Sequence, residues 1–258
     1  MESFSESSWR GRLKPLLPPL LLDIYRGVRY GSACRRSLMG TQDGVGTDTK
    51  DVQFTLPSRA LNELFPGIDS VLVTAPVTEL YRPRDMVVPL AELLTLAAIC
   101  RHSRPRRVFE IGTYTGSSTL VMAINVSDQA EILTLDLEPS ETVGAAYRGT
   151  QHSSKIRQLY GNSLTFDYSP FLGSVDFVLV DANHTYDCVK SDTEKAFELL
   201  RPGGVIVWDD YRWLECHAEC AGVTLFLNEL QRRRSIFSIT GTRFAIYVDR
   251  ELGRDRQS

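Results

Sequence analysis

The sequence predicts an α/β fold, in which a mostly parallel sheet carries helices on both faces and ends in an antiparallel hairpin. Short apolar runs follow one another after Arg107, and helix-like stretches separate most of them. Near the C-terminus, two strand-like runs flank the turn Thr240-Gly241-Thr242. Alternating strands and helices favour parallel strands covered on both sides, whereas a tight turn between two strands joins them antiparallel.

The hydrophobic pattern divides the regular part of the chain into elements. The expected strands are residues 108–111, 132–135, 156–160, 175–180 and 205–208, followed by the hairpin. The expected helices are residues 116–126, 140–148 and 186–200, and an earlier helix that starts near Pro89 and stops before the basic stretch at 101–107. Residues 162–174 have little helical pattern.

Length and composition favour one catalytic domain with an N-terminal extension. The chain has 258 residues, of which 43% are hydrophobic, and this is enough to bury a full core. We expect residues 1–50 to form a basic extension and linker, and residues 51–258 to form the domain. The net charge of −3 gives no general attraction to nucleic acid, so a small-molecule partner is expected.

The N-terminal extension carries a basic segment with a short predicted helix between Pro19 and Tyr30. Two interpretations stay open. The helix packs on the domain or on a second subunit of a homodimer, or it contacts an anionic membrane surface or a partner enzyme. No stretch approaches the roughly 20 apolar residues of a membrane span. The expected location is therefore cytoplasmic, and in the second interpretation peripheral to the inner membrane surface.

The five cysteines are scattered along the chain and odd in number, which is typical of reduced thiols in a cytosolic protein. The stretch Cys216-His217-Ala218-Glu219-Cys220 suggests zinc at first sight. No second pair of Cys or His follows it at a ligand spacing. A zinc site is therefore not the favoured interpretation of this stretch.

A glycine turn follows the first regular strand and is expected to line a ligand site. It reads Glu110-x-Gly112-x-Tyr114-x-Gly116. A dinucleotide fingerprint needs glycine where Tyr114 stands, and a phosphate-binding loop needs a lysine, which residues 113–127 lack. An acid, a close backbone approach and an aromatic ring instead suit a ligand with an amino group, a thioether or sulfonium linker and a nucleoside.

The next two strands end in residues that suit the rest of such a ligand. Asp136 is placed to accept hydrogen bonds from both hydroxyls of a ribose, and Asn162 and Ser163 can bond an adenine edge. Each residue taken alone has an ordinary structural explanation, such as a surface acid or a loop asparagine. Their order at the ends of consecutive strands is much more specific, because ligands bind outside the carboxyl ends of parallel strands.

Three carboxylates are expected to converge at the same edge. Asp181 follows one apolar run, and Asp209 and Asp210 follow another that one crossover helix separates from it. Clustered carboxylates raise one another's pKa unless a cation is present, and oxygen ligands favour Mg²⁺, for which Mn²⁺ or Ca²⁺ can substitute. In the alternative interpretation Asp209 caps a turn and Asp210 faces solvent.

From about Pro89 to Val248 the sequence resembles the class I S-adenosylmethionine-dependent methyltransferases. It is most similar to the metal-dependent O-methyltransferase group, which includes catechol O-methyltransferase, the macrocin and macrolide-sugar enzymes and cephalosporin-hydroxylase-like proteins. The resemblance implies S-adenosylmethionine as cofactor and a Rossmann-like sheet of seven strands with the last one antiparallel. The implied cofactor residues are Glu110, Gly112, Tyr114, Gly116, Ser118, Asp136, Leu137, Asn162, Ser163 and Asp181, and the implied metal ligands are Asp181, Asp209 and Asp210.

The expected reaction is transfer of a methyl group to a hydroxyl of a small molecule or glycan. Asp181 and His184 are the candidate catalytic residues, because a metal ligand can activate a hydroxyl and an imidazole with a pKa of about 6.5 can accept its proton. His184 as a helix cap or a fourth metal ligand is the alternative. Residues 51–88 and the segment after Tyr211 are the expected acceptor-side cover.

Two other functions stay open at this point. One is a metal-dependent oxygenase. Its non-haem iron site would need two histidines and a carboxylate, and only one histidine of the sequence is expected at the strand ends, which argues against it. The other is a non-catalytic S-adenosylmethionine-binding partner subunit. For such a subunit the cluster of Asp181, His184, Asp209 and Asp210 would have no use.

Overall fold

The computed structural model describes residues 52–76, 89–212 and 221–249 of the chain. All of them belong to one compact unit, Asp48–Ser258. The predicted helix between Pro19 and Tyr30 and the Cys216–Cys220 stretch lie outside the described residues. So does much of the expected acceptor-side cover, including residues 77–88.

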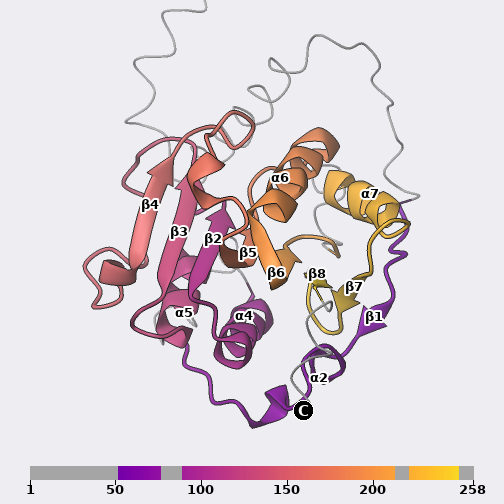
Figure 1. Ribbon diagram of the computed structural model, residues 1–258, viewed down its shortest axis with the longest axis horizontal. Coiled ribbons are helices and arrows are strands. Elements are labelled where there is room, and N and C mark those ends of the chain that lie inside the picture. Colours follow the sequence, from indigo (N-terminus) through magenta and orange to yellow (C-terminus); the bar gives the residue numbers. More distant parts are fainter. Residues whose placement is uncertain (1–51, 77–88, 213–220, 250–258) are drawn as a thin grey trace, which may run out of the picture. The chain divides into compact units, whose positions relative to one another are not determined.

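A single sheet of eight strands forms the centre of this unit, in the order β1-β7-β8-β6-β5-β2-β3-β4 (Figure 1). The mostly parallel sheet and its antiparallel β7–β8 hairpin confirm the predicted fold class. Its strands are β1 (Ser58–Arg59), β2 (Arg107–Ile111), β3 (Glu131–Asp136), β4 (Ile156–Tyr160), β5 (Val175–Val180), β6 (Leu200–Trp208), β7 (Ile236–Ile239) and β8 (Ala245–Val248).

The expected count of seven strands was wrong by one. The additional strand is β1, which pairs with β7 in parallel at the edge of the sheet. It has two residues, both exposed, so it carries no run of alternating apolar side chains that the sequence could reveal.

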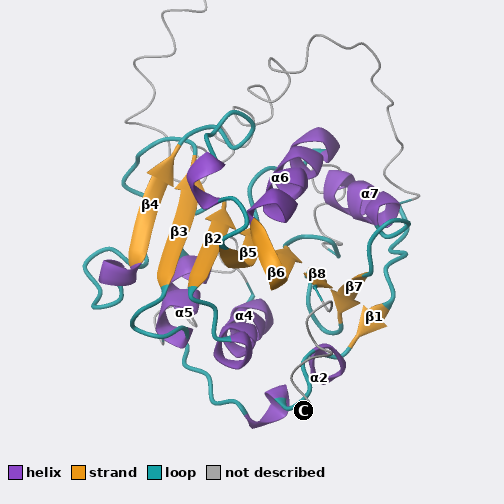
Figure 2. Cartoon of the chain, viewed as in Figure 1, coloured by secondary structure: helices purple, strands orange, loops and turns teal. Residues whose placement is uncertain are grey.

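Helices cover both faces of the sheet, as predicted, and Figure 2 shows them alternating with the strands along the chain. α4 and α5 pack together on one face, and α6 and α7 pack together on the other (Figure 1). The described helices are α2 (Leu61–Leu64), α4 (Leu90–Ser103), α5 (Ser117–Asn125), α6 (Tyr186–Leu199) and α7 (Ala221–Leu230), with short 3₁₀ helices at Ile68–Ser70, Ser153–Lys155 and Ser169–Phe171.

The two faces of the sheet have separate cores because neighbouring residues of a strand point to opposite sides. Phe109 and Ile111 of β2 join the cluster under α6 and α7. Val108 joins the cluster under α4 and α5. Glu110 shares the side of Val108, and its side chain is fully buried.

The predicted helix at 140–148 was wrong, since this segment forms turns. Gly144 has a φ of 73°, outside the right-handed helical region. The N–H of Gly144 donates to the carbonyl of Tyr114, and the N–H of Ala146 donates to that of Thr115, both at 2.8 Å. These two bonds to the glycine turn take the place of helical hydrogen bonds.

Two smaller expectations also need correction. α4 continues through Arg101 and His102 to Ser103 and ends where Arg104 adopts a left-handed conformation, rather than before the basic stretch. Cys100 is a free, buried thiol as expected, but Cys188 on α6 is disulfide-bonded, so the expectation of reduced thiols was wrong for that residue. Among the described helices, none is long and apolar enough to cross a membrane.

Candidate active site

The carboxyl ends of the parallel strands bring the predicted site residues to one edge of the sheet. β2, β5 and β6 are hydrogen-bonded neighbours, so the residues that follow them, Gly112, Asp181 and Asp209, lie side by side. Backbone bonds continue the sheet one step beyond the strands, from the N–H of Asp181 to Ile111 and from that of Asp209 to Val180. Asp136 ends β3, next to β2 on its other side.

Glycine is required at two positions of the turn after β2. Gly112 has a φ of 103°, and a Cβ there would overlap the backbone carbonyl of Asp181. Gly116 has a φ of 78°, and its Cβ would lie 2.6 Å from the ring of Tyr147. The turn therefore packs directly on the strand end that carries Asp181 and on the segment that follows β3.

Asp136 is held in place by backbone donors from both sides. The N–H of Tyr114 donates to its Oδ2 at 2.8 Å, and the N–H of Leu137 donates to its Oδ1 at 2.7 Å. Each carboxylate oxygen has a further lone pair for a ligand hydroxyl. Tyr114 has a φ of 45°, and its side chain is 37% exposed. The predicted ribose acceptor and the predicted aromatic residue are thus linked to each other.

Glu110 and Ser118, two of the predicted cofactor residues, are buried beside the turn. The Oε2 of Glu110 accepts hydrogen bonds from the hydroxyls of Thr119 and Thr134. Burial raises the pKa of Glu110 to about 7, although the hydroxyls of Thr119, Thr134 and Ser118 lower it. Its Oε1 has no hydrogen-bond partner in the described part of the chain.

Asn162 and Ser163 follow β4 and are half-buried. The Oδ1 of Asn162 accepts the N–H of Leu164 at 3.0 Å, so this side chain shapes its own turn. Asn162 and Ser163 thus lie directly after β4, at the same edge of the sheet as Asp136. Asp192 of α6 is a fully buried carboxyl, and neither of its oxygens has a hydrogen-bond partner in the described part of the chain.

Replacing Asp192 with asparagine is expected to stabilise the protein at pH 8 by about 2–4 kcal/mol. Burial raises the pKa of Asp192 to about 7. A carboxyl with a raised pKa in the folded state contributes stability that is complete below its unfolded pKa and is lost as the pH rises through its folded pKa. Urea unfolding should therefore show a higher free energy of unfolding for Asp192→Asn than for the wild type at pH 8 but not at pH 4. An equal increase at both pH values would contradict this account.

The acidic residues after β5 and β6 form a compact group of possible ligands with a histidine. One oxygen or nitrogen from each of Asp181, His184 and Asp210 lies within 4.8 Å of the others. The Nε2 of His184 is 2.7 Å from the Oδ2 of Asp210. Burial, followed by the charges of Asp209 and Asp210, raises the pKa of Asp181 well above its usual value. Such a group fits a divalent cation, because a cation would offset both the burial of the carboxylates and the repulsion between them.

Asp210 is buried and has a φ of 61°, a left-handed conformation that aspartate tolerates better than most residues. Strained backbone of this kind is common at functional sites. The Oδ1 of the neighbouring Asp209 accepts the N–H of Asp210 at 2.7 Å, and the Oδ2 of Asp209 lies 3.5 Å from the guanidinium of Arg243. The group close enough to share an ion contains two of the three predicted ligands, Asp181 and Asp210, together with His184, the alternative fourth ligand.

Sequence reasoning missed three residues that shape the site. Arg243 lies in the β7–β8 connection and contacts both Asp209 and Asp210, and Glu92 of α4 binds the other side of its guanidinium. Gly222 of α7 packs so closely on the segment of His184 that a Cβ would overlap its carbonyl. None of them belongs to a recognisable motif.

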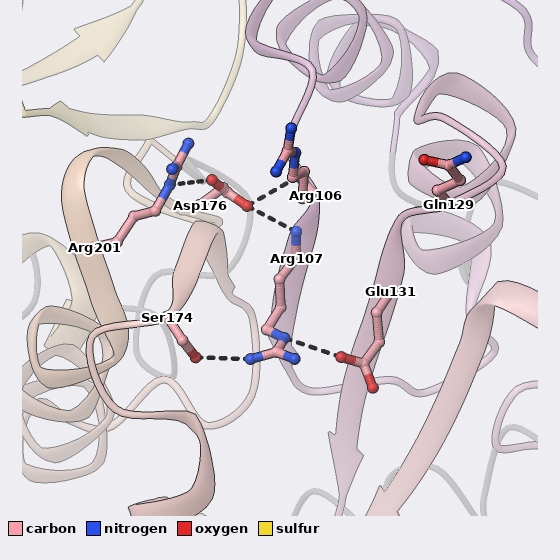
Figure 3. A pocket seen from close by; sticks show the side chains of 7 residues that line it. All are labelled: Arg106, Arg107, Gln129, Glu131, Ser174, Asp176 and Arg201. Carbon is pink, nitrogen blue, oxygen red and sulfur yellow. Dashed lines mark hydrogen bonds and ion pairs between the residues drawn. The ribbon is translucent and has the colours of Figure 1, made fainter.

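A hollow of about 330 Å³ lies at the opposite, amino-terminal edge of the sheet (Figure 3). Its charged groups are largely paired with one another. Asp176 accepts two backbone N–H groups and pairs with Arg201, and Arg107 pairs with Glu131 at 2.9 Å. The lining residues are Arg106, Arg107, Gln129, Glu131, Ser174, Asp176 and Arg201. These contacts stabilise the amino-terminal edge of the sheet and are separate from the site at its carboxyl edge.

Comparison with known proteins matches the part of the chain that carries this site. Residues 109–211 match a family model described as a methyltransferase domain. A caffeoyl-CoA O-methyltransferase from Stellaria longipes is 30% identical over 132 residues, which cover 48% of this chain and 54% of the relative. The chain thus spans about half the length of the curated relatives that it matches.

Solved structures extend the likeness in fold to most of the chain. The O-methyltransferase TomG from Streptomyces achromogenes, solved with S-adenosylmethionine, has a TM-score of 0.54 and 23% identity, covering 73% of this chain and 96% of that one. An O-methyltransferase from Bacillus cereus, solved with S-adenosylhomocysteine, has a TM-score of 0.54 and 18% identity, covering 72% and 97%.

Proposed function

We propose that this chain, which has the class I methyltransferase fold and whose residues 109–211 match a methyltransferase-domain family model, is an S-adenosylmethionine-dependent O-methyltransferase. The acceptor is a hydroxyl of a small molecule or glycan. One observation carries the proposal: the glycine turn with Asp136 and the group of Asp181, His184 and Asp210 lie at the same sheet edge. A nucleoside site and an acid–base site are thereby neighbours.

The cofactor half of the site is formed by the turn between β2 and α5 and by the ends of β3 and β4. Asp136 accepts the ribose hydroxyls, because two backbone N–H groups already fix its carboxylate. Gly112 and Gly116 let the turn pack on Asp181 and Tyr147, which holds its backbone at this edge of the sheet. Tyr114, Leu137, Asn162 and Ser163 border the nucleoside, and Glu110 and Ser118 support the turn from below.

The acceptor half of the site is built around Asp181, His184 and Asp210. The carboxylates of Asp181 and Asp210 fit Mg²⁺ or, as substitutes, Mn²⁺ or Ca²⁺. When bound, such an ion supplies Lewis-acid activation of the acceptor hydroxyl. In methyl transfer the oxygen–carbon bond forms as the sulfur–carbon bond breaks, so the sulfonium becomes a neutral thioether and the hydroxyl proton must be removed. His184 accepts that proton, and the carboxylate of Asp210, whose Oδ2 lies 2.7 Å from Nε2, stabilises the imidazolium that forms.

An oxygenase is not supported by the histidines of the described residues. His102 of α4 bonds the carbonyl of Pro66, and His152 lies in the segment before β4. Only His184 of the described residues lies with the carboxylates, whereas a facial iron triad needs two histidines.

Replacing His184 with glutamine is expected to lower kcat by about 10²–10⁴-fold, because the proton acceptor is lost. The affinity for S-adenosylhomocysteine should stay within a few fold, since the residue lies outside the cofactor half of the site. Single-turnover kinetics and calorimetry measure the two quantities. Wild-type turnover in the variant would refute the base assignment, and a parallel loss of Mg²⁺ affinity would instead favour the role of metal ligand.

The proposed activity is tested by methyl-transfer assays on polyols, sugars and catechols, with a radiolabelled methyl group on S-adenosylmethionine. The expected result is transfer to at least one hydroxyl acceptor, which a chelator lowers and Mg²⁺ restores. Transfer that a chelator does not affect would contradict the metal part of the proposal. Label recovered on nitrogen or sulfur would contradict the acceptor class.

A further inference from the structure

Arg243 is anchored on one side by a buried carboxylate. Its Nε and its backbone N–H donate to the Oε1 of Glu92, at 3.1 and 2.9 Å, and its Nη2 lies 3.3 Å from the Oε2. Glu92 belongs to α4 and is 2% exposed. Both residues lie outside the part of the chain that matches the methyltransferase family, so the match does not account for this pair.

The other side of the guanidinium faces the acidic site. Its Nη1 lies 3.2 Å from the Oδ1 of Asp210, and its Nη2 lies 3.5 Å from the Oδ2 of Asp209. The side chain of Arg243 is 19% exposed, and those of both aspartates are 5% exposed or less. Ion pairs in such surroundings are weakly screened by water and salt.

The arrangement distributes the charges of the site unevenly. Arginine stays protonated at any physiological pH, so Arg243 is a permanent positive charge among Asp209, Asp210 and Glu92. Asp209 contacts that charge and is outside the group close enough to share a metal ion. Asp210 contacts both the guanidinium and His184 through different oxygens.

We propose that Arg243 is the built-in counter-cation of the acidic site. It neutralises Asp209, leaves Asp181 and Asp210 beside His184 as the carboxylate ligands, and lowers the affinity of the site for a divalent cation. This inference rests on the metal part of the proposed function. Glu92 moderates the effect, because its negative charge offsets part of the field of Arg243 at the ligands.

The alternative is that Arg243 and Glu92 only anchor the β7–β8 connection to α4. The two roles predict opposite effects of removing Arg243 on the affinity for a metal ion. A counter-cation repels a metal ion, so its removal strengthens binding, and removal of Glu92 weakens it. A structural anchor positions the ligands, so loss of either partner weakens binding.

The test is a titration of the full chain with Mn²⁺ alone, followed by electron paramagnetic resonance, without cofactor or acceptor. Arg243→Gln is expected to bind Mn²⁺ at least about tenfold more tightly than the wild type, because a like charge near the ion is removed. Glu92→Gln should bind it several-fold more weakly, and Arg243→Lys should stay close to the wild type. Arg107→Gln, at the opposite edge of the sheet, is the matched control and should change nothing.

Each outcome decides between the two roles. Weaker binding by both Arg243→Gln and Glu92→Gln, or unchanged binding by both, would overturn the inference and leave the proposed function standing if the wild type binds Mn²⁺. Binding by Arg243→Gln alone would support the inference and contradict a metal-assisted reaction in the wild type. If circular dichroism shows that Arg243→Gln does not fold, Arg243→Lys decides, because lysine keeps the charge but loses the guanidinium bonds to Glu92. Binding close to the wild type would support the counter-cation role, and clearly weaker binding would overturn it.

Discussion

Replacing Asp181 with asparagine is expected to lower kcat of methyl transfer about a thousandfold, because the site loses a carboxylate that activates and positions the acceptor hydroxyl. The fold should tolerate the change. Asparagine has nearly the same size, and the backbone N–H of residue 181 still bonds the carbonyl of Ile111. Removing one of three crowded carboxylates also relieves the burial and repulsion that raise the pKa of Asp181.

The prediction for Asp181 is checked by kcat, the free energy of unfolding and the affinity for S-adenosylhomocysteine, measured side by side. Unfolding should be unchanged or more difficult in the variant, and cofactor affinity should change far less than kcat. Asp167→Asn is the matched control, since this carboxylate is exposed and bonds only the neighbouring Ser169 among the described residues. If both variants retained wild-type turnover, Asp181 would have no part in the reaction.

Replacing Gly112 with alanine is expected to destabilise the protein by about 3–5 kcal/mol and to abolish cofactor binding in whatever fraction folds. The new methyl group would overlap the carbonyl of Asp181, and backbone inside a sheet cannot move away cheaply. The φ of 103° adds strain that any side chain would suffer. Any relaxation would have to separate the ends of β2 and β5, where both halves of the site meet.

Gly149→Ala separates these two causes in urea unfolding experiments. Gly149 also has a positive φ, 75°, but a Cβ there has no neighbour within 4 Å. Gly149→Ala should lower the free energy of unfolding by about 1 kcal/mol, which is the effect of placing a side chain at a positive φ without any steric overlap. Equal losses in the two variants would show that the close approach of Gly112 to Asp181 does not matter.

Most of the sheet could be predicted because its strands are buried and apolar. The bounds of β4 and β5 agree with the expected ones to the residue, and those of β2 and β3 within one residue at either end. β6 begins earlier than expected, at Leu200, so that Pro202-Gly203-Gly204 lies within the strand. The prediction of a helix at 140–148 was wrong because backbone N–H groups of this segment bond to the glycine turn. The local sequence pattern does not reveal such a tertiary contact.

The site could be predicted only as far as strand ends determine it. The rule that ligands bind at the carboxyl edge placed Asp136, Asp181 and Asp209 correctly along the sheet. The rule does not say where each side chain points, so the contact between Asp209 and Arg243 could not be predicted, although His184 beside the carboxylates was. The bond between Arg243 and Glu92 joins residues 151 positions apart and has no sequence signature.

Calorimetric titration of the full chain with S-adenosylhomocysteine, in the presence and absence of Mg²⁺, tests the central claim most directly. The account predicts saturable binding of one molecule per chain, which Asp136→Ala abolishes because the ribose acceptor is lost. Absence of any saturable binding to the folded wild-type chain, with or without Mg²⁺, would contradict it.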